Sequence, residues 1–417
     1  MYSLIRANAA FRSLWTARAV SFLGGSVSSV ALILYVAGEA GTGAAVALLM
    51  LVGEALPSLL APVAGALADR IEPRRLMVAC EVGQGVVLAL VAFLLPSLPV
   101  LLTLVAAKSL LAVVFDPAGR SVLPRLVADR DLERANAALG LGTYGLEVAG
   151  PLVAAALLPA LGVRGVLWLD VATFAASAVL LGGLPRLPRP ERPDTEAVAG
   201  IWVDVGAGLR YLLRHRMVRM LALCFWGVVL CTGLDDVVLV FLARDTLHAG
   251  DSAVSLLYGG VGLGLLVGLV SAARRRVAVA DPTGGPASRP LVVAGAGAVV
   301  AGLGVSAAGN LLTGLASAFW AALAFQAVRG LGIAAVEVGL PAVIARSVPE
   351  HLRGRMFALV YGGVSLAAAL SYVVGGVALG VTSPGAILVV AGALGALTCA
   401  VVGWALYHRS GDQFTVG

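Results

Sequence analysis

Residues 65–75 read GALADRIEPRR, and this short charged stretch separates two long apolar runs. The first run extends over about residues 44–68 and the second over about residues 76–95, and each is long enough to cross a bilayer. Because hydrocarbon cannot solvate charged side chains, the acid and the arginines of this stretch are expected in water at the membrane edge. The stretch therefore predicts a loop between two transmembrane helices.

The composition of the whole chain also indicates a membrane protein. The 417 residues are 60% hydrophobic and only 12% charged, which is more apolar than the core of a soluble domain requires. The apolar runs do not alternate with polar residues, so helices are favoured over the strands of a membrane barrel. We expect an all-α membrane protein with transmembrane helices at about residues 12–38, 44–68, 76–95, 98–117, 136–160, 165–184, 217–243, 253–273, 291–308, 313–338, 357–380 and 385–407.

The distribution of positive charge predicts the orientation. Of the 29 Lys and Arg residues, 24 lie in the N-terminal segment, in the loops after even-numbered spans and in the C-terminal segment. Only Arg164 and Arg244 lie in the opposite loops. Because positive loops stay inside, we expect both termini in the cytoplasm. The abundance of Ala, Gly and Arg is typical of GC-rich bacterial genomes, so a multi-pass protein of a bacterial plasma membrane is predicted. The net charge of +6 is then explained by the basic loops on the cytoplasmic side, and no nucleic-acid partner is expected.

A loop rich in proline and arginine divides the twelve spans into two sets of six. We predict an N-terminal six-helix bundle at residues 1–184, a cytoplasmic linker at 185–216 and a C-terminal six-helix bundle at 217–417. The end of the linker, from Trp202 to Arg216, has amphipathic character and is expected to lie on the inner membrane surface.

The two halves repeat at an offset of 221 residues. At this offset Lys108 aligns with Arg329, and Asp116 aligns with Glu337. Charges inside a membrane are rare, so their alignment with the sign kept indicates duplication rather than chance. We therefore expect two pseudo-symmetric bundles.

Several motifs resemble those of one protein family. The stretch at 65–75 resembles the signature G-x-L-x-D-R-x-x-x-R-R between helices 2 and 3 of the major facilitator superfamily. The sequences DPAGRSVLPRLV at 116–127, LDVATF at 169–174 and VPEHLRGR at 348–355 are similar to the branch that contains the enterobactin exporter and macrolide efflux proteins. The resemblance covers nearly the whole chain. It implies a secondary transporter that works by alternating access and exports its substrate.

The resemblance also implies an inner gate. Asp69, Arg70, Arg74 and Arg75 would lock the cytoplasmic side of the two halves together, with Asp116 at the end of the fourth span. Glu337 is the counterpart of Asp116 in the second half. Asp116 lies two turns, or about 12 Å, from Lys108, so the two cannot form an ion pair.

Charged residues deep in the predicted spans are candidates for handling protons or substrate, because each is costly in lipid. These candidates are Glu54, Lys108, Glu147, Asp235, Asp236 and Arg329. Arg18 lies nearer the inner surface, where its side chain could extend to water, so a structural role is favoured.

Lys108 is the only lysine in the chain. Lysine changes its protonation state on burial more readily than arginine, so a role with protons or substrate is favoured over a structural ion pair. Glu54 and Lys108 each lie roughly 15 Å deep by helix rise, so an ion pair between them is geometrically possible. Glu147 is also near mid-depth, where lost hydration favours a protonated carboxyl, and a purely structural hydrogen bond is the equal alternative.

Asp235 and Asp236 are adjacent, so they point about 100° apart on a helix and only one can face a cavity squarely. Their repulsion favours a proton on at least one of them. A structural role remains the alternative.

Other classes of protein fit the sequence less well. An aspartyl protease needs two aspartates from different helices, the four histidines are scattered, and no G-x-x-x-x-G-K-[ST] loop occurs. Gly259–Gly264, inside a span, is interpreted as a helix-packing segment. We therefore expect no enzyme, no metal and no cofactor.

The predicted function is export of small amphipathic molecules, such as a drug, an antibiotic or a siderophore, in exchange for protons. The partners are this substrate, protons and the lipid bilayer, and the protein is expected to be a monomer. A facilitator or importer of a small metabolite stays the main alternative, ahead of a membrane enzyme or receptor.

Overall fold

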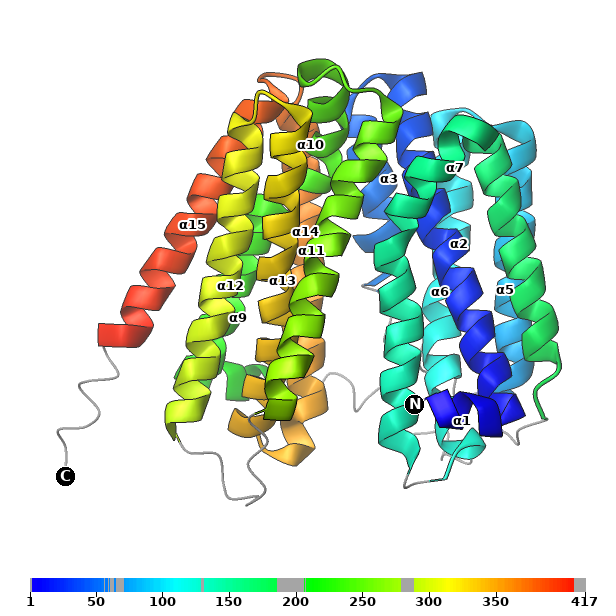
Figure 1. The fold of residues 1–417 in the computed structure, drawn as a ribbon, viewed down its shortest axis with the longest axis horizontal. Helices are drawn as coiled ribbons and strands as arrows, with labels where there is room; N and C mark the ends of the chain where they lie inside the picture. Colours follow the sequence, from blue (N-terminus) through cyan, green and yellow to red (C-terminus); the bar gives the residue numbers. More distant parts are fainter. Residues whose placement is uncertain are drawn as a thin grey trace. The chain divides into compact units, whose positions relative to one another are not determined.

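The computed structural model describes residues 2–55, 57, 58, 60, 64, 71–128, 131–185, 206, 208–278 and 289–408. These residues form helices joined by short turns and contain no β-strand. The chain divides into two compact units (Figure 1). Unit 1 comprises Met1–Val198 and Asp251–Gly259, and unit 2 comprises Ala199–Gly250 and Gly260–Gly417. The all-α prediction is confirmed.

Unit 1 holds the helices that correspond to the first six predicted spans. They are α1 (Tyr2–Ala7), α2 (Ala9–Ala40), α3 (Gly43–Met50), the π-helix η1 (Leu51–Ala55), α5 (Pro73–Leu94), α6 (Leu98–Leu126) and α7 (Leu132–Gly182). Helix α2 packs mainly against α7, and α5 packs against α6 and α7. Phe11, Leu14 and Met77 are fully buried in the apolar core of this unit.

Helix α7 contains two predicted spans. Its backbone is non-helical at Gly162, where φ is 63° and ψ is 176°. Figure 1 shows the chain turning back within α7, so that the residues before and after Gly162 form two separate helical segments. These segments match the spans predicted at 136–160 and 165–184.

Unit 2 holds the remaining helices. They are α9 (Arg216–Thr232), α10 (Asp235–Phe241), the π-helix η3 (Leu242–Thr246), α11 (Asp251–Ala278), α12 (Arg289–Leu315), α13 (Phe319–Ser347), α14 (Glu350–Ala378) and α15 (Pro384–His408). The first residues of α11, up to Gly259, group with unit 1. Helix α12 packs against α13 and α15, and α9 packs against α14 and α15. Leu221 and Met356 are among the buried residues of this core.

Within the described ranges, ten helical segments are long and apolar enough to cross a membrane. One of them, Ala149–Gly182, includes the turn at Gly162 and thus contributes to two predicted spans. The span predicted at 44–68 corresponds in its described part to the shorter apolar helix Gly43–Ala55. The described parts of the twelve predicted spans are therefore mainly helical, with turns at residues 233 and 234 and near the ends of several spans.

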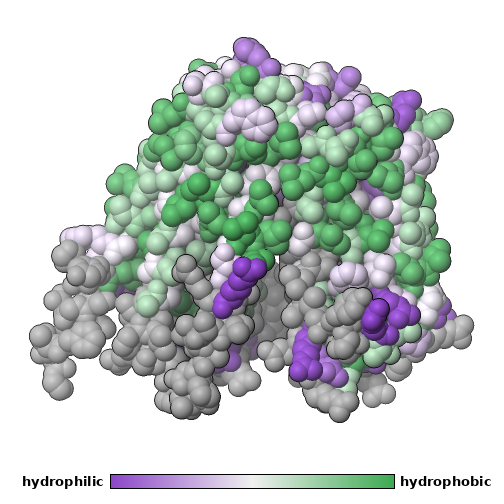
Figure 2. Space-filling model, in the orientation of Figure 1, coloured by the Kyte–Doolittle hydropathy of each residue, from purple (hydrophilic) through white to green (hydrophobic). Residues whose placement is uncertain are grey.

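Large apolar side chains are spread over the surface (Figure 2). Phe93, Trp320, Val381 and Trp404 are each at least 65% exposed. A soluble protein of this size rarely exposes so much contiguous apolar area, because water disfavours it. The exposed side chains instead suit a surface that faces lipid.

The span predicted at 217–243 is not one continuous helix. Helix α9 ends at Thr232, and α10 begins at Asp235 after a turn at Gly233 and Leu234. The amide of Asn310 on α12 donates a hydrogen bond of 3.3 Å to the carbonyl of Thr232 at this turn. Gly233 and Leu234 keep right-handed helical backbone angles, and Arg216–Thr246 forms one membrane-length span, so the predicted span is confirmed and its helix is only locally interrupted.

Glycines allow the helices of unit 2 to pack backbone against backbone. A side chain at Gly264 of α11 would collide with the carbonyl of Ala327 on α13, and one at Gly330 with the carbonyl of Val261. Small residues are common at such contacts because lipid supplies no hydrophobic force to hold membrane helices together. These two pairs form the glycine seam between α11 and α13.

Candidate functional site

A buried ion pair lies in unit 2. Nη2 of Arg329 on α13 lies 2.7 Å from Oδ2 of Asp235 on α10, and the two side chains are 12% and 0% exposed. A Cβ atom at Gly309 of α12 would lie 2.8 Å from Cβ of Arg329, so glycine leaves room for the arginine. Among the described residues, Arg329 is the only basic side chain that forms an ion pair with Asp235. The structure thus brings these two predicted candidates together.

Asp236, the third candidate in unit 2, faces α14. The hydroxyl of Tyr372 donates a hydrogen bond of 3.3 Å to Oδ2 of Asp236. Arg329 also interacts electrostatically with Asp236, so both acids belong to one charged cluster although their side chains point about 100° apart on the helix. Both lie in the first turn of α10, where the helix dipole favours negative charge.

Uncharged polar side chains lie in the same part of unit 2. Asn310, Thr313 and Gln326 are all fully buried. Nε2 of Gln326 donates to Oγ1 of Thr313 at 3.1 Å and to Oδ1 of Asn310 at 3.5 Å. These bonds connect α12 to α13, and the bond from Asn310 to Thr232 connects α12 to the break before Asp235. The break and the ion pair thus belong to one polar region inside an apolar bundle.

A second polar cluster lines a cavity of about 190 Å³ in unit 1. Its wall includes Ser21, Phe22, Glu81, Gln84, Lys108 and Phe174, from helices α2, α5, α6 and α7. Glu81 is 1% exposed, and the hydroxyl of Ser21 lies 3.1 Å and 3.2 Å from its two carboxylate oxygens. Nζ of Lys108 lies 5.8 Å from the centre of the Phe174 ring. The cavity therefore combines an acid and a lysine with aromatic walls.

Asp170 on α7 is the second buried acid of unit 1. Its carboxylate accepts hydrogen bonds from Ser28 at 2.5 Å and from Thr173 at 2.8 Å, and Lys108 interacts with it electrostatically. A side chain at Gly24 of α2 would collide with both Asp170 and Thr173. Gly24 therefore makes room for this acid between α2 and α7.

The ion pair suggested between Glu54 and Lys108 is not the arrangement that Lys108 adopts. Among the described residues, the contacts of Lys108 are with Phe174 and Asp170 on α7. Glu54 lies in η1 at an exposed position. Glu147 lies on α7, and its side chain is outside the described part of the structure. The equal depth of Glu54 and Lys108 in the bilayer was therefore not sufficient to predict that they form an ion pair.

Two of the predicted gate residues, Asp69 and Arg70, lie outside the described ranges. Arg74 donates a hydrogen bond to the carbonyl of Gly182 at the end of α7. The side chain of Arg75 is 75% exposed and pairs with Glu72 at 2.8 Å.

The other two gate candidates lie on α6 and α13. Asp116 forms an ion pair of 2.7 Å with Arg18, and Glu337 is exposed on α13. Arg18 is only 6% exposed, and its guanidinium carbon lies 5.4 Å from the ring centre of Phe22 and 5.5 Å from that of Phe115. Arg18 thus has a structural partner, but it is buried rather than extended into water.

Four residues of these clusters were not among the predicted site candidates. Glu81 and Asp170 are acids inside predicted spans, so the criterion that selected Glu54 could also have selected them. Asn310 and Gln326 are uncharged, and a search for intramembrane charges could not find them.

The sequence matches the family model of the Major Facilitator Superfamily over residues 14–301. The chain therefore belongs to this superfamily of membrane transporters. It is a multi-pass membrane protein that carries a small-molecule substrate, and it is a transporter rather than an enzyme.

Two curated relatives are uncharacterized transporters of the same kind. YfiS of Bacillus subtilis is 23% identical over 334 residues, which are 79% of this chain and 77% of YfiS. The protein y4rN of Sinorhizobium fredii is 34% identical over 176 residues, which are 39% of this chain and 41% of y4rN.

Solved structures show the same fold. A mutant of the peptide transporter POT in complex with alafosfalin has a TM-score of 0.75 at 14% identity, covering 97% of this chain and 95% of that chain. The nucleoside transporter NupG has a TM-score of 0.71 at 10% identity, covering 96% of this chain and 99% of that chain.

Proposed function

We propose that this transporter exports small amphipathic molecules from a bacterial cell in exchange for protons. In this proposal a monomer in the plasma membrane, with both termini in the cytoplasm, alternates between inward-open and outward-open states. The moving halves are residues 1–184 and 217–417, joined by the linker at 185–216.

The observation that supports proton coupling is the buried pair of Asp235 and Arg329. Each charge inside a membrane costs a few kcal/mol or more unless it is paired. A buried ion pair often contributes no more stability than apolar residues of the same size. An ion pair inside an apolar bundle is therefore better explained by a functional role than by a contribution to the stability of the fold.

The pair offers a simple proton cycle. A proton that reaches Asp235 from outside removes its negative charge, and Arg329 then loses its partner. When the proton leaves toward the cytoplasm, the ion pair forms again. Because forming or breaking the pair changes how α10 is held against α13, proton uptake can favour one conformation of the transporter over the other.

The cavity in unit 1 is the proposed cargo site. Its volume of about 190 Å³ is below the roughly 300–1,000 Å³ of pockets that enclose drug-sized ligands, so it suits one end of a cargo molecule. Phe22 and Phe174 offer apolar walls, while Glu81 and Lys108 offer an acid and an amine for polar contacts. An amphipathic molecule matches this combination.

The direction of transport rests on the resemblance of the loops at 116–127 and 348–355 to efflux proteins. Relatives of known fold include proteins named for peptide and nucleoside transport, so import is the competing outcome.

Transport assays on proteoliposomes test the proposal. The wild-type protein should move amphipathic dyes such as ethidium against their gradient when a pH gradient is imposed, and Asp235→Asn should abolish this while keeping exchange at equal pH. Asp245→Asn, which changes an exposed acid of η3, is the matched control and should behave as wild type. Gradient-driven transport that survives in Asp235→Asn would contradict coupling at this pair. Movement of dye in the same direction as protons would indicate import.

A further inference from the structure

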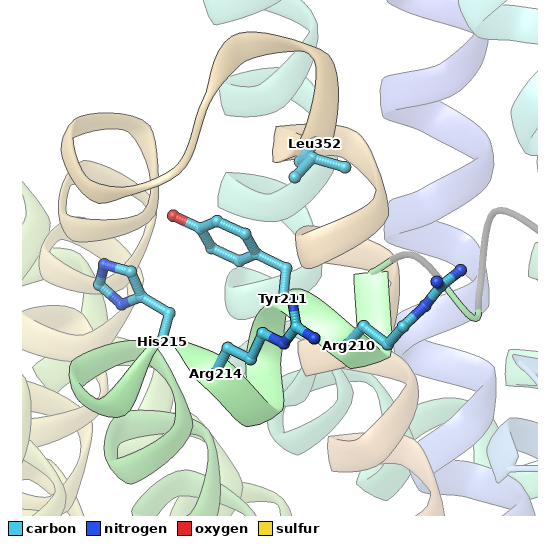
Figure 3. Close-up of a pocket in the computed structure, with 5 residues that line it drawn as sticks. All are labelled: Arg210, Tyr211, Arg214, His215 and Leu352. Atoms are coloured by element: carbon cyan, nitrogen blue, oxygen red, sulfur yellow. The ribbon is translucent and has the colours of Figure 1, made fainter.

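A cationic cavity of about 530 Å³ lies in unit 2, away from the two buried clusters. Its lining residues are Arg210, Tyr211, Arg214, His215 and Leu352 (Figure 3). The first four belong to the segment at 208–215, whose residues 208–214 are helical and which directly precedes α9, and Leu352 belongs to the first turns of α14. The side chains of Arg210 and Arg214 thus line the same cavity.

The segment is firmly built into unit 2. A Cβ atom at Gly208 would lie 2.8 Å from a methyl carbon of Leu359 on α14, and Leu212 is 3% exposed in the apolar core. The hydroxyl of Tyr211 donates a 2.8 Å hydrogen bond to the carbonyl of Ser347 at the end of α13. Burial raises the pKa of Tyr211, so the phenol remains protonated and able to donate. The cavity is therefore held in shape by contacts with α13 and α14.

The outer face of the segment combines arginine and leucine. Arg210 and Arg214 are exposed and lie one turn apart. Leu209 and Leu213 are also exposed, at 43% and 53%, and form a second row next to the arginines. A helical face with a cationic row beside an apolar row is typical of segments that lie in the membrane interface.

We propose that this face binds the headgroup of an anionic phospholipid. The guanidinium groups of Arg210 and Arg214 would hold the phosphate, since the arginine fork matches phosphate oxygens with two parallel hydrogen bonds. Leu209 and Leu213 would contact the upper acyl chains. A free phosphate ion would use the arginines but not the leucines, so the exposed leucines favour a lipid.

The predicted topology agrees with such a ligand. The linker is expected on the cytoplasmic side, where the leaflet carries anionic lipids and attracts basic segments near the membrane. A bound lipid would hold the segment that contacts the end of α13 through Tyr211 and leads directly into α9. Lipid composition would in this way influence helices that carry the ion pair.

Binding to the purified full-length protein in detergent tests the proposal. The midpoint of thermal unfolding is followed while phosphatidylglycerol, phosphatidylcholine or inorganic phosphate is added. Phosphatidylglycerol should raise the midpoint, and the double variant Arg210→Ala/Arg214→Ala should need at least tenfold more of it. Arg12→Ala/Arg134→Ala removes two exposed arginines of unit 1 and should change the requirement less than twofold. Leu209→Ser/Leu213→Ser should weaken the effect of phosphatidylglycerol several-fold.

Three results would overturn the proposal. Phosphatidylcholine could stabilise the protein as well as phosphatidylglycerol does, inorganic phosphate could reproduce the shift, or both arginine double variants could lose it equally. The lipid-free unfolding midpoints of all variants show whether each is folded. This experiment measures stabilisation by lipid and does not measure transport. A negative result would therefore not bear on the proposal of proton-coupled export.

Discussion

Gly24 and Gly25 are neighbours on α2, yet their surroundings differ. A side chain at Gly24 would collide with Asp170 and Thr173, whereas a Cβ at Gly25 would meet no atom of a neighbouring described residue within 4 Å. Gly24→Ala should therefore displace the buried acid and destabilise the protein by about 1–3 kcal/mol, the usual range for overpacking. Gly25→Ala should be neutral or slightly stabilising, because alanine is the better helix former by about 1 kcal/mol.

Thermal unfolding of the two purified variants, compared with wild type, checks this prediction. Equal midpoints for Gly24→Ala and Gly25→Ala would show that Asp170 is not confined by α2.

Helix α7 shows how one residue shapes an element. Gly162 has a positive φ of 63° at the turn between its two segments. Gly162→Ala should cost roughly 1–3 kcal/mol, because a φ of 63° with a ψ of 176° is a backbone conformation that essentially only glycine adopts. Gly140 lies in the helical part of α7, and a Cβ added there would meet no atom of a neighbouring described residue within 4 Å, so Gly140→Ala is the matched control and should not destabilise. Denaturant titration followed by circular dichroism would measure both, and a larger loss for Gly140→Ala would contradict the assigned turn.

Sequence predicted the elements better than their contacts. The spans followed from apolar length, which the membrane itself imposes. The break before Asp235 could not be seen, since Gly233 and Leu234 are both compatible with an apolar run and the contact from Asn310 comes from 78 residues away. The pairing of Asp235 with Arg329 and of Glu81 with Ser21 likewise depends on which helices are neighbours. Spacing within one helix carries no such information.

For the whole molecule, the arginine distribution predicts which loops face the cell interior. Thr246 and Arg134 are both exposed, so accessibility within the fold does not distinguish them. In a variant without the native cysteines, Thr246→Cys should react with a membrane-impermeant maleimide added to whole cells, and Arg134→Cys should react only after permeabilisation. The opposite pattern would reverse the predicted orientation.

The glycine seam between α11 and α13 has a consequence for biogenesis. Gly264 and Gly330 contribute little to the hydropathy that lets a helix enter the bilayer from the translocon, so insertion alone does not account for them. Their benefit comes later, when inserted helices select their partners by shape. Larger apolar residues at these two positions would leave every span inserted but would deprive α11 of its docking surface. Insertion and assembly of unit 2 are therefore separable steps that depend on different residues of the same helices.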